Sequence, residues 1–363
     1  MNPNTQKLHA TGQSIWLDNI TRDLLDNGTL AHYIKDLSVT GLTSNPSIFE
    51  HAIGSGTTYD SAVLNLAAQG LSGEALFFEL ALQDLTRAAD LFRPVFNATK
   101  GVDGWVSLEV SPLLADDTAT TVRVAADLHA RAARPNVFIK IPGTQAGIAA
   151  IEESIFAGVP VNVTLLFSRD QYLAAAHAYM RGIQRRLDAH LDPQVESVAS
   201  LFISRWDVAI ATATPPALHN RLGIAVAMRT YKAYHELLLS ESWRKLAAAG
   251  AHPQRLLWAS TGTKDPAARD TLYVEALVAP GTINTLPEKT LLAFADHGKV
   301  GNSLPFNGGD AEAVIAELNN ASFDEATLAA KLQREGAESF NQSWRTLIAC
   351  LEDKVTQKAA LQP

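Results

Sequence analysis

Short apolar runs rich in β-branched residues alternate along this chain with longer amphipathic segments. Short buried runs of this kind indicate strands, and apolar residues three or four positions apart indicate helices. The predicted strands span residues 14–20, 39–45, 105–111, 136–142, 159–167, 197–204, 255–261 and 282–287. The helical patterns cover residues 71–92, 118–133, 147–157, 169–187, 211–249 and 266–277. Strands that are each followed by helix predict an α/β fold of the (β/α)8 TIM-barrel type.

An open, doubly wound sheet is the competing α/β architecture. Such a sheet carries a glycine-rich turn after its first strand, whereas residues 18–22 read Asp-Asn-Ile-Thr-Arg. We therefore expect one (β/α)8 barrel domain over residues 1–363. Residues 50–104 exceed the minimum length between the second and third strands and should hold extra helix. Residues 298–363, after the last strand, should do so as well.

The predicted C-terminal helix has no assigned docking place. Ser322-Phe-Asp-Glu325 has the pattern of a capping box that opens a helix. After Gly336, a final helix carries an apolar stripe that includes Phe340 and Trp344. This stripe must pack on something, and the barrel wall and the barrel mouth are both open as alternatives.

Alternation along the fourth predicted strand turns a lysine toward the barrel interior. Val137, Ile139 and Ile141 share one face, and Phe138 and Lys140 share the other. The all-aliphatic face should meet the surrounding helices. Lys140 should therefore point inward.

The same alternation turns other polar side chains inward on neighbouring strands. In the fifth strand, Val161, Val163 and Leu165 should face the helices. The predicted inward set includes Trp16 and Asp18, Glu109, Asn162 and Thr164, and Ser200 and Phe202, together with Ser14, Ser107 and Ser204, while the second strand ends in Thr43-Ser-Asn45. Most of these residues stand near strand carboxyl ends, where barrel active sites form. Burying polar groups costs free energy, so the convergence of so many of them indicates a functional site and not a structural core.

The amino-acid composition limits the kinds of binding partner and the cellular compartment that we expect. The chain has 363 residues, a formal net charge of −8 and no run of Lys or Arg, which argues against nucleic acid and anionic membranes as partners. A single cysteine, Cys350, permits no internal disulfide and fits a reducing compartment. Residues 1–13 are polar and unlike a signal peptide. These features predict a cytoplasmic protein. The scattered histidines show no ligand spacing, so no metal site is expected.

Two readings of Lys140 remain open at this point. Burying an ammonium without a partner is costly, and a buried amine responds by losing its proton. A neutral amine is a nucleophile toward carbonyls. Lys140 is therefore either a structural ion-pair partner or a Schiff-base catalyst, for which Asp18 and Glu109 could supply separate proton transfers.

The remaining inward residues suit a polyol phosphate. Asn45 and Asn162 offer paired donors and acceptors for hydroxyl groups, and Thr164 could hold a water molecule. Arg205 follows the sixth strand and Lys264 the seventh. Barrels often bind phosphate at the loops after their last strands, so both cations are candidate phosphate ligands.

Five segments resemble the transaldolase family, in particular its longer bacterial subgroup, in the order that family has them. They are Ser-Ile-Trp-Leu-Asp at 14–18, Gly-Leu-Thr-Ser-Asn-Pro-Ser at 41–47, Val-Ser-Leu-Glu-Val at 106–110, Ile-Lys-Ile-Pro-Gly-Thr at 139–144 and Val-Asn-Val-Thr-Leu at 161–165. The resemblance implies a class I aldolase-type barrel without metal or organic cofactor. It implies transfer of a dihydroxyacetone unit from sedoheptulose 7-phosphate or fructose 6-phosphate to an aldose phosphate.

The resemblance also implies a role for each candidate residue. Lys140 would form the Schiff base, Asp18 would handle the proton of the C4 hydroxyl, and Glu109 would shuttle protons through a water held by Thr164. The implied binding residues are Asn45 and Asn162 for the dihydroxyacetone unit and Ser200 and Arg205 for phosphate. The expected partners are sugar phosphates, and a monomer or a homodimer is expected.

Two positions, Lys264 and Phe202, bear on how closely this chain follows the family pattern and on which activity it has. Shorter family members carry an arginine after the seventh strand, where this chain has Lys264 as a possible replacement. Phe202 matches true transaldolases, whereas related simple aldolases have tyrosine. The alternative is therefore a fructose-6-phosphate-type aldolase that releases free dihydroxyacetone, and Phe202 argues against it. A catalytically inactive barrel would require loss of a central residue, and none is lost.

Overall fold

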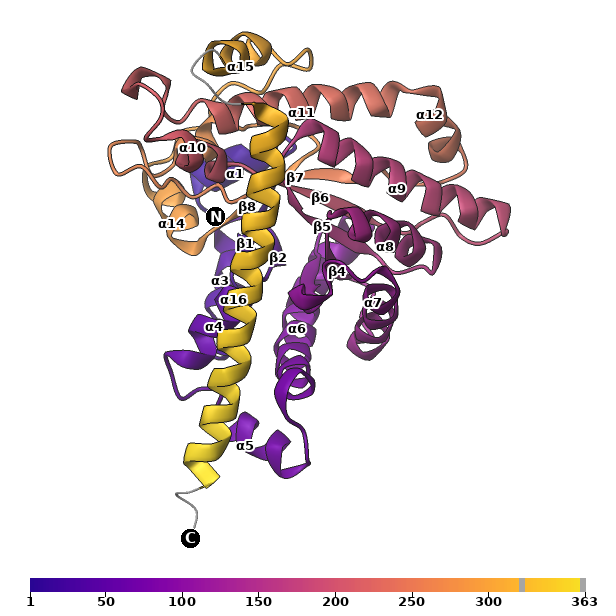
Figure 1. The fold of residues 1–363 in the computed structure, drawn as a ribbon, viewed down its shortest axis with the longest axis vertical. Coiled ribbons are helices and arrows are strands. Elements are labelled where there is room, and N and C mark those ends of the chain that lie inside the picture. The colour runs from indigo at the N-terminus through magenta and orange to yellow at the C-terminus, as the bar shows by residue number, and fades with distance from the viewer. Residues whose placement is uncertain (320–323, 360–363) are drawn as a thin grey trace.

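A computed structural model describes residues 1–319 and 324–359, and within these ranges the chain forms a closed barrel of eight parallel strands in sequence order (Figure 1). The strands are β1 Ser14–Asp18, β2 Val39–Thr43, β3 Val106–Glu109, β4 Val137–Pro142, β5 Val161–Leu166, β6 Ser197–Phe202, β7 Arg255–Ala259 and β8 Ile283–Leu286. Each lies inside a segment predicted as a strand. The predicted (β/α)8 fold is confirmed.

Helices surround this barrel on its outer side. Their bounds are α1 Pro3–Ala10, α2 Arg22–Asp26, α3 Thr29–Asp36, α4 Pro46–Gly54, α5 Asp60–Ala68, α6 Gly73–Ala98, α7 Thr118–Ala132, α8 Gln145–Phe156, α9 Arg169–Asp188, α10 Ser204–Ile210, α11 Leu222–Leu239, α12 Glu241–Ala248, α13 Leu272–Ala276, α14 Glu288–His297, α15 Ala311–Asn319 and α16 Glu325–Ala359. Short 3-10 turns lie at Pro112–Leu114 and Pro216–Leu218. The expected extra helices are present as α4 and α5 between β2 and α6, and as α15 and α16 after β8.

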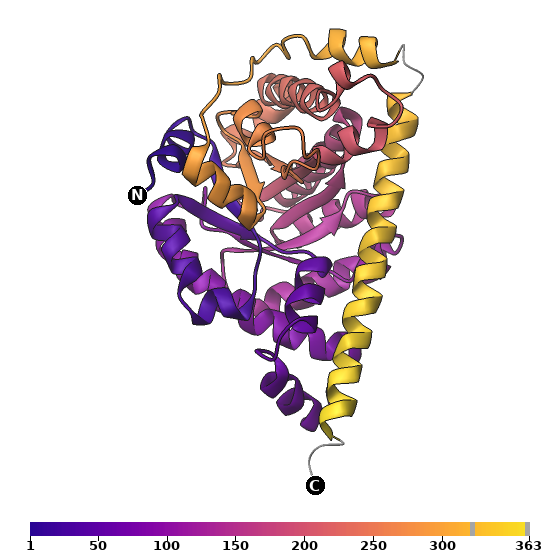
Figure 2. The same ribbon diagram turned by 90° about the vertical axis from the view of Figure 1, so that its left-hand side faces the viewer.

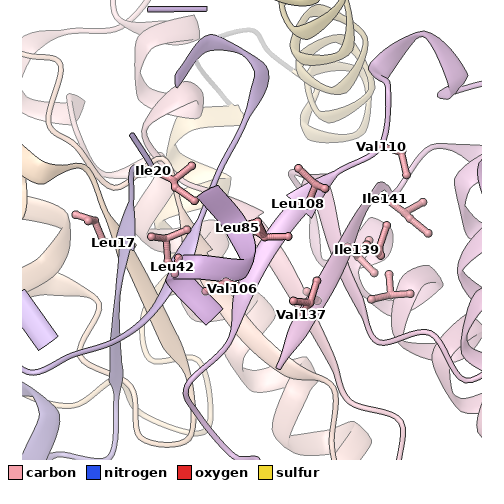
Figure 3. Packing of buried hydrophobic residues seen from close by; sticks show 14 of the residues in the cluster. Leu17, Ile20, Leu42, Leu85, Val106, Leu108, Val110, Val137, Ile139 and Ile141 are labelled. Atoms are coloured by element: carbon pink, nitrogen blue, oxygen red, sulfur yellow. The ribbon is translucent and has the colours of Figure 1, made fainter. Parts of the chain in front are cut away.

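The main hydrophobic core lies between the barrel wall and the helices. Leu42, Val106 and Val137 are register partners across β2, β3 and β4, so their side chains share the outer face. Figure 3 shows them with Ile139 and with Leu85 of α6, in one buried cluster. Burial of each such side chain contributes about 1.5–3 kcal/mol. A second buried cluster includes Trp16, Phe138 and Phe202, which the alternation predicted to point inward.

The predicted outward direction of Leu165 is wrong. The register between β5 and β6 shifts between Val163 and Leu166, and Leu165 has a φ of +58°. This irregularity inserts one residue and turns Leu165 into the inner cluster, while Leu166 packs with the outer core in its place. Strict alternation cannot anticipate such a bulge.

Two predicted helices are shorter than expected. The segment 211–249 contains α11 and α12 and begins with a loop. Ser240 ends α11 in an extended conformation and caps α12, its hydroxyl accepting from the Trp243 amide at 3.2 Å. The segment 266–277 is helical only over Leu272–Ala276. The Asp265 carboxylate accepts from the Ala267 amide at 2.9 Å and stabilises a turn in place of the predicted helix start.

The C-terminal helix α16 is continuous through Gly336, so the prediction that a separate helix begins there is wrong. The proposed cap residue Ser322 lies outside the described residues. The Asp324 side chain accepts from the Thr327 amide at 2.8 Å and caps α16. Figures 1 and 2 show α16 passing the barrel and then running beside α4 to α5.

The distal half of α16 is anchored by polar contacts as well as its apolar stripe. Trp344 donates to Glu74 of α6 at 2.7 Å, and Lys354 lies 2.7 Å from an Asp60 carboxylate oxygen of α5. The helix also contacts β5 at the barrel end. The barrel-mouth alternative is therefore realised for one end of α16, whereas the other end packs on the helices after β2 and not on the barrel wall.

Candidate active site

A cavity of about 130 Å3 lies at the carboxyl ends of the strands. Eight of the ten candidate residues line it, namely Asp18, Asn45, Lys140, Thr164, Ser200, Phe202, Arg205 and Lys264. The other two, Glu109 and Asn162, are buried beside Lys140. The fold thus brings residues from β1 to β7 and their following loops into one place.

Lys140 stands at the centre because of the strand register. Glu109, Lys140 and Asn162 are register partners on β3, β4 and β5, so the three side chains point the same way at the same height. Lys140 Nζ lies 3.2 Å from Glu109 Oε2 and donates to the carbonyl oxygen of Ser44 at 2.9 Å. Only 6% of the lysine side chain is exposed. These contacts aim the amine at the cavity.

The two carboxyl groups of the site have different surroundings. Asp18 accepts from the Thr43 hydroxyl at 2.8 Å, and Thr43 also shares a 2.7 Å hydrogen bond with the hydroxyl of Thr285. Glu109 pairs directly with Lys140, whereas Asp18 interacts with the charge of Lys140 without a hydrogen bond to it.

Burial raises the pKa of both carboxyl groups above their usual values. The positive charge of Lys140 opposes this increase in both, and the Thr43 hydrogen bond opposes it further in Asp18. For Glu109, the neighbouring negative charge of Asp18 adds to the increase. Raised carboxyl pKa values beside a cavity suit groups that exchange protons.

Hydrogen bonds beneath the cavity orient the polar groups on β5 and β6. Asn162 donates to the Ser107 hydroxyl at 3.1 Å and accepts from the Ser200 hydroxyl at 2.7 Å. Thr164 Oγ1 is buried and has no hydrogen-bond partner among the described residues. That hydroxyl can therefore bind a water molecule or a substrate group. Asn45 caps α4 by accepting from the Ile48 amide at 3.1 Å.

Cations lie at the outer end of the cavity. The Arg205 guanidinium carbon is 5.4 Å from the centre of the Phe202 ring, in a cation–π arrangement. Burial lowers the pKa of Arg205. Lys264 lines the same cavity, and its charge weakly opposes the rise that burial causes in the pKa of Asp18. Both cations predicted at the barrel mouth therefore face the site.

Sequence reasoning missed some of the cavity residues. Ser260, Thr285 and Phe340 also line it, as does Thr43, which the sequence pattern placed only at the end of the second strand. Alternation could have found Thr285, which shares a strand face with the inward Ile283. Phe340 comes from α16, far from the barrel strands along the chain, and the sequence pattern left open whether its apolar stripe packs on the barrel wall or at the barrel mouth.

The described residues offer no metal centre and no membrane span. Among them, no group of three or more His, Cys, Asp or Glu side chains is arranged to hold a metal ion. No helix in the described part of the chain is long and apolar enough to cross a membrane.

The barrel and its lysine-centred cavity define an enzyme of the (β/α)8 class. Residues 15–351 match the family model described as transaldolase/fructose-6-phosphate aldolase, and the chain belongs to this family. A relative from Renibacterium salmoninarum, named transaldolase, is 45% identical and covers 99% of this chain and 98% of its own. Relatives from Parafrankia sp. and Mycolicibacterium smegmatis, also named transaldolase, are 45% and 42% identical. They cover 97% and 96% of this chain, and 98% and 96% of their own lengths.

Proposed function

We propose that this protein is a transaldolase that moves a dihydroxyacetone unit from a ketose phosphate to an aldose phosphate through a Schiff base on Lys140. The observation that carries the proposal is the buried Lys140 amine, which faces a cavity and stands 3.2 Å from the carboxylate of Glu109. The family membership and the names of the relatives support the same reaction.

Imine formation is the first step. The Lys140 amine adds to the C2 carbonyl of the ketose, and the resulting carbinolamine loses its hydroxyl as water. Glu109 is close enough to the amine to deliver and remove these protons, directly or through one water molecule. The free hydroxyl of Thr164 can hold that water. Hydrolysis of the imine at the end of the cycle runs these transfers in reverse.

Carbon–carbon cleavage is the second step. Asp18 takes the proton of the C4 hydroxyl, the C3–C4 bond breaks, and its electron pair moves into the iminium to give an enamine on Lys140. The shortened aldose phosphate then leaves. An incoming aldose phosphate accepts the enamine carbon at its aldehyde, and Asp18 returns the proton to the new hydroxyl. Atoms and charge balance over the cycle without an oxidant or a cofactor.

The polar groups around Lys140 would orient the substrate. Asn45 and Asn162 would hold the hydroxyls of the dihydroxyacetone unit. Arg205, Ser200 and Lys264 would bind the phosphate, because charge-assisted hydrogen bonds from cations are strong phosphate contacts.

Release of free dihydroxyacetone is the alternative activity within this family. It requires a proton donor for the enamine carbon. Phe202 lines the cavity and has no hydroxyl to donate, which favours transfer to an acceptor over release. Comparing free dihydroxyacetone with transferred product in the presence of an aldose phosphate separates the two activities.

Borohydride trapping tests the Schiff base. The protein is incubated with fructose 6-phosphate, reduced and digested, and mass spectrometry locates the adduct. We expect a reduced dihydroxyacetone adduct on Lys140 and loss of both adduct and transfer in Lys140→Ala. Full activity in Lys140→Ala, together with an unmodified Lys140 in the wild type, would refute the proposal.

The cellular setting belongs to the same proposal. Transfer between sedoheptulose 7-phosphate and glyceraldehyde 3-phosphate is a step of the pentose phosphate pathway, which we propose for this enzyme in the cytoplasm. Sugar phosphates are the proposed partners, and a monomer or a homodimer remains the predicted assembly.

A further inference from the structure

Three residues on one side of α16 face the barrel mouth. Gln333, Gly336 and Phe340 are three and four positions apart, which puts them on one face of the helix. Figures 1 and 2 show this helix crossing the barrel on its way to α4 and α5. The face in question is the part of α16 nearest the proposed substrate site.

Gln333 binds α16 to the ends of two barrel strands. Its side-chain amide donates to the carbonyl oxygen of Gly143 at 3.0 Å and to that of Leu165 at 2.9 Å. Gly143 follows β4, which carries Lys140, and Leu165 lies in β5 directly after Thr164. The left-handed backbone at Leu165 belongs to the β5 irregularity. One side chain therefore bridges the strand ends beside the reactive lysine.

Gly336 allows the helix to approach Arg205 closely. A Cβ at this position would lie 3.3 Å from Arg205 Nη1 and 3.0 Å from Leu165 Cδ2. Both distances are tighter than ordinary van der Waals contact. Glycine in a helix interior destabilises the helix by about 1 kcal/mol relative to alanine. The close approach of α16 to Arg205 explains why glycine occupies this position.

Arg205 is consequently enclosed from two sides. The Phe202 ring lies 5.4 Å from its guanidinium carbon, and on the other side a Cβ at Gly336 of α16 would lie only 3.3 Å from Nη1. Phe340, one turn further along α16, lines the same cavity and is 5% exposed. A long arginine side chain loses much rotamer freedom in such an enclosure before any ligand arrives, which preorganises its donors.

We propose that the 333–340 face of α16 is part of the substrate site, and that Gly336 is a positioning residue that holds Arg205 in the orientation that binds a substrate phosphate monoester. This inference rests on the proposed function, in which Arg205 binds phosphate. Docking of the helix does not by itself require this face, because Trp344 and Lys354 anchor α16 on α6 and α5.

Gly336→Val is the principal test, and Ala330→Val on the exposed face of α16 is the matched control. Activity is measured at saturating sedoheptulose 7-phosphate with glyceraldehyde 3-phosphate or unphosphorylated glyceraldehyde as acceptor. We expect Gly336→Val to raise the KM for glyceraldehyde 3-phosphate about tenfold, the loss of one well-oriented contact. The KM for glyceraldehyde and the control variant should stay at wild-type values.

A double-mutant cycle identifies the mediator of the effect. If Gly336 acts through Arg205, Gly336→Val should add nothing further in an Arg205→Ala background. A full additional tenfold loss there would overturn the positioning role. An equal loss for both acceptors, or an unchanged KM for both, would overturn it as well.

A second variant guards against misfolding of Gly336→Val. Gln333→Leu removes the two carbonyl contacts, and Gln342→Leu, on the exposed side of α16, is its control. We expect Gln333→Leu to raise the same KM selectively, whereas wild-type kinetics in this variant would overturn the proposed role of the face.

Borohydride trapping with free dihydroxyacetone tests the Lys140 Schiff base independently of phosphate binding, since this probe carries no phosphate. An adduct on Lys140 in Gly336→Val and wild type, together with an unchanged KM, would overturn the role of α16 alone. Absence of the adduct in the wild type would overturn the proposed function and this inference with it.

Discussion

Asp18→Asn and Glu109→Gln should slow different steps of the reaction. Both substitutions keep the size of the side chain and remove its ability to exchange a proton. Glu109 lies 3.2 Å from Lys140 Nζ, so its loss should slow imine formation and imine hydrolysis. Asp18 accepts a hydrogen bond from Thr43 and interacts with Lys140 only through its charge. Its loss should therefore leave imine formation largely intact and slow cleavage of the C3–C4 bond.

The expected magnitudes follow from general acid–base catalysis. A positioned proton-transfer group contributes about 10²–10⁴-fold in rate. At about 1.36 kcal/mol per factor of ten, each variant should raise the barrier of its own step by about 2.7–5.4 kcal/mol. The other step should change by less than about tenfold, because Lys140 and its remaining contacts are retained.

Two measurements separate the steps. The rate of borohydride-trappable adduct formation with free dihydroxyacetone reports imine formation, because no carbon–carbon bond breaks. Single-turnover release of aldose phosphate from fructose 6-phosphate adds the cleavage step. The exposed Asp188→Asn is the control for the first substitution and should resemble the wild type in both assays. Equal slowing of both steps by both variants would refute the division of roles.

Stability provides an independent check on Asp18. Burial raises the pKa of its folded-state carboxyl group, so the folded protein binds this proton more tightly than the unfolded chain does. The free energy of unfolding contributed by such a group falls as the pH rises through its titration. At neutral pH, Asp18→Asn should therefore be at least as stable as the wild type in urea unfolding. A clear loss of stability would show that the charged form of Asp18 supports the fold.

Three further predictions concern packing, pH and reaction type. Gly41→Ala should destabilise the fold by about 1–3 kcal/mol in urea unfolding, because its Cβ would lie 2.5 Å from the Trp16 ring. Gly56→Ala, with no atom within 4 Å, is its control, and equal stability of the two variants would contradict the packing argument. Burial raises the pKa of Asp207 from 3.8 to about 6, so the stability of the wild type relative to Asp207→Asn should fall by about 2 kcal/mol as the pH rises from about 4 to about 6. A difference that does not vary with pH would disprove this, and denaturant titrations over that range are the measurement. Phe202→Tyr should increase release of free dihydroxyacetone relative to transfer, because a phenol near the enamine can donate the missing proton. An unchanged product ratio in an assay of both products would argue against that account of Phe202.

Strand alternation was sufficient to predict most of the site. The pattern at 136–142 turned Lys140 inward, and the same pattern placed Glu109 and Asn162 on the inner face of their strands. The register of β3, β4 and β5 then aligns these three side chains. Alternation succeeds here because β3, β4 and the first part of β5 follow a period of two and their outer-facing side chains are aliphatic.

Alternation failed where the backbone departs from that period. Leu165 was predicted to face outward and lies in the inner cluster, because the β5 irregularity inserts one residue between Val163 and Leu166. The apolar sequence around it gives no local signal of the bulge. Its left-handed backbone is maintained by tertiary contacts, including the hydrogen bond from Gln333.

The sequence by itself determined the eightfold alternation of strand and helix, the lysine-centred polar set and the family to which the chain belongs. Those properties are encoded locally, in side-chain period and in short motifs. Only the tertiary structure decided that α16 lies against the barrel mouth, because an amphipathic stripe specifies that a helix must be covered and not what covers it. Gly336 and Phe340 reach Arg205 and the cavity through that docking alone, and so their place at the site has no counterpart in the local sequence pattern.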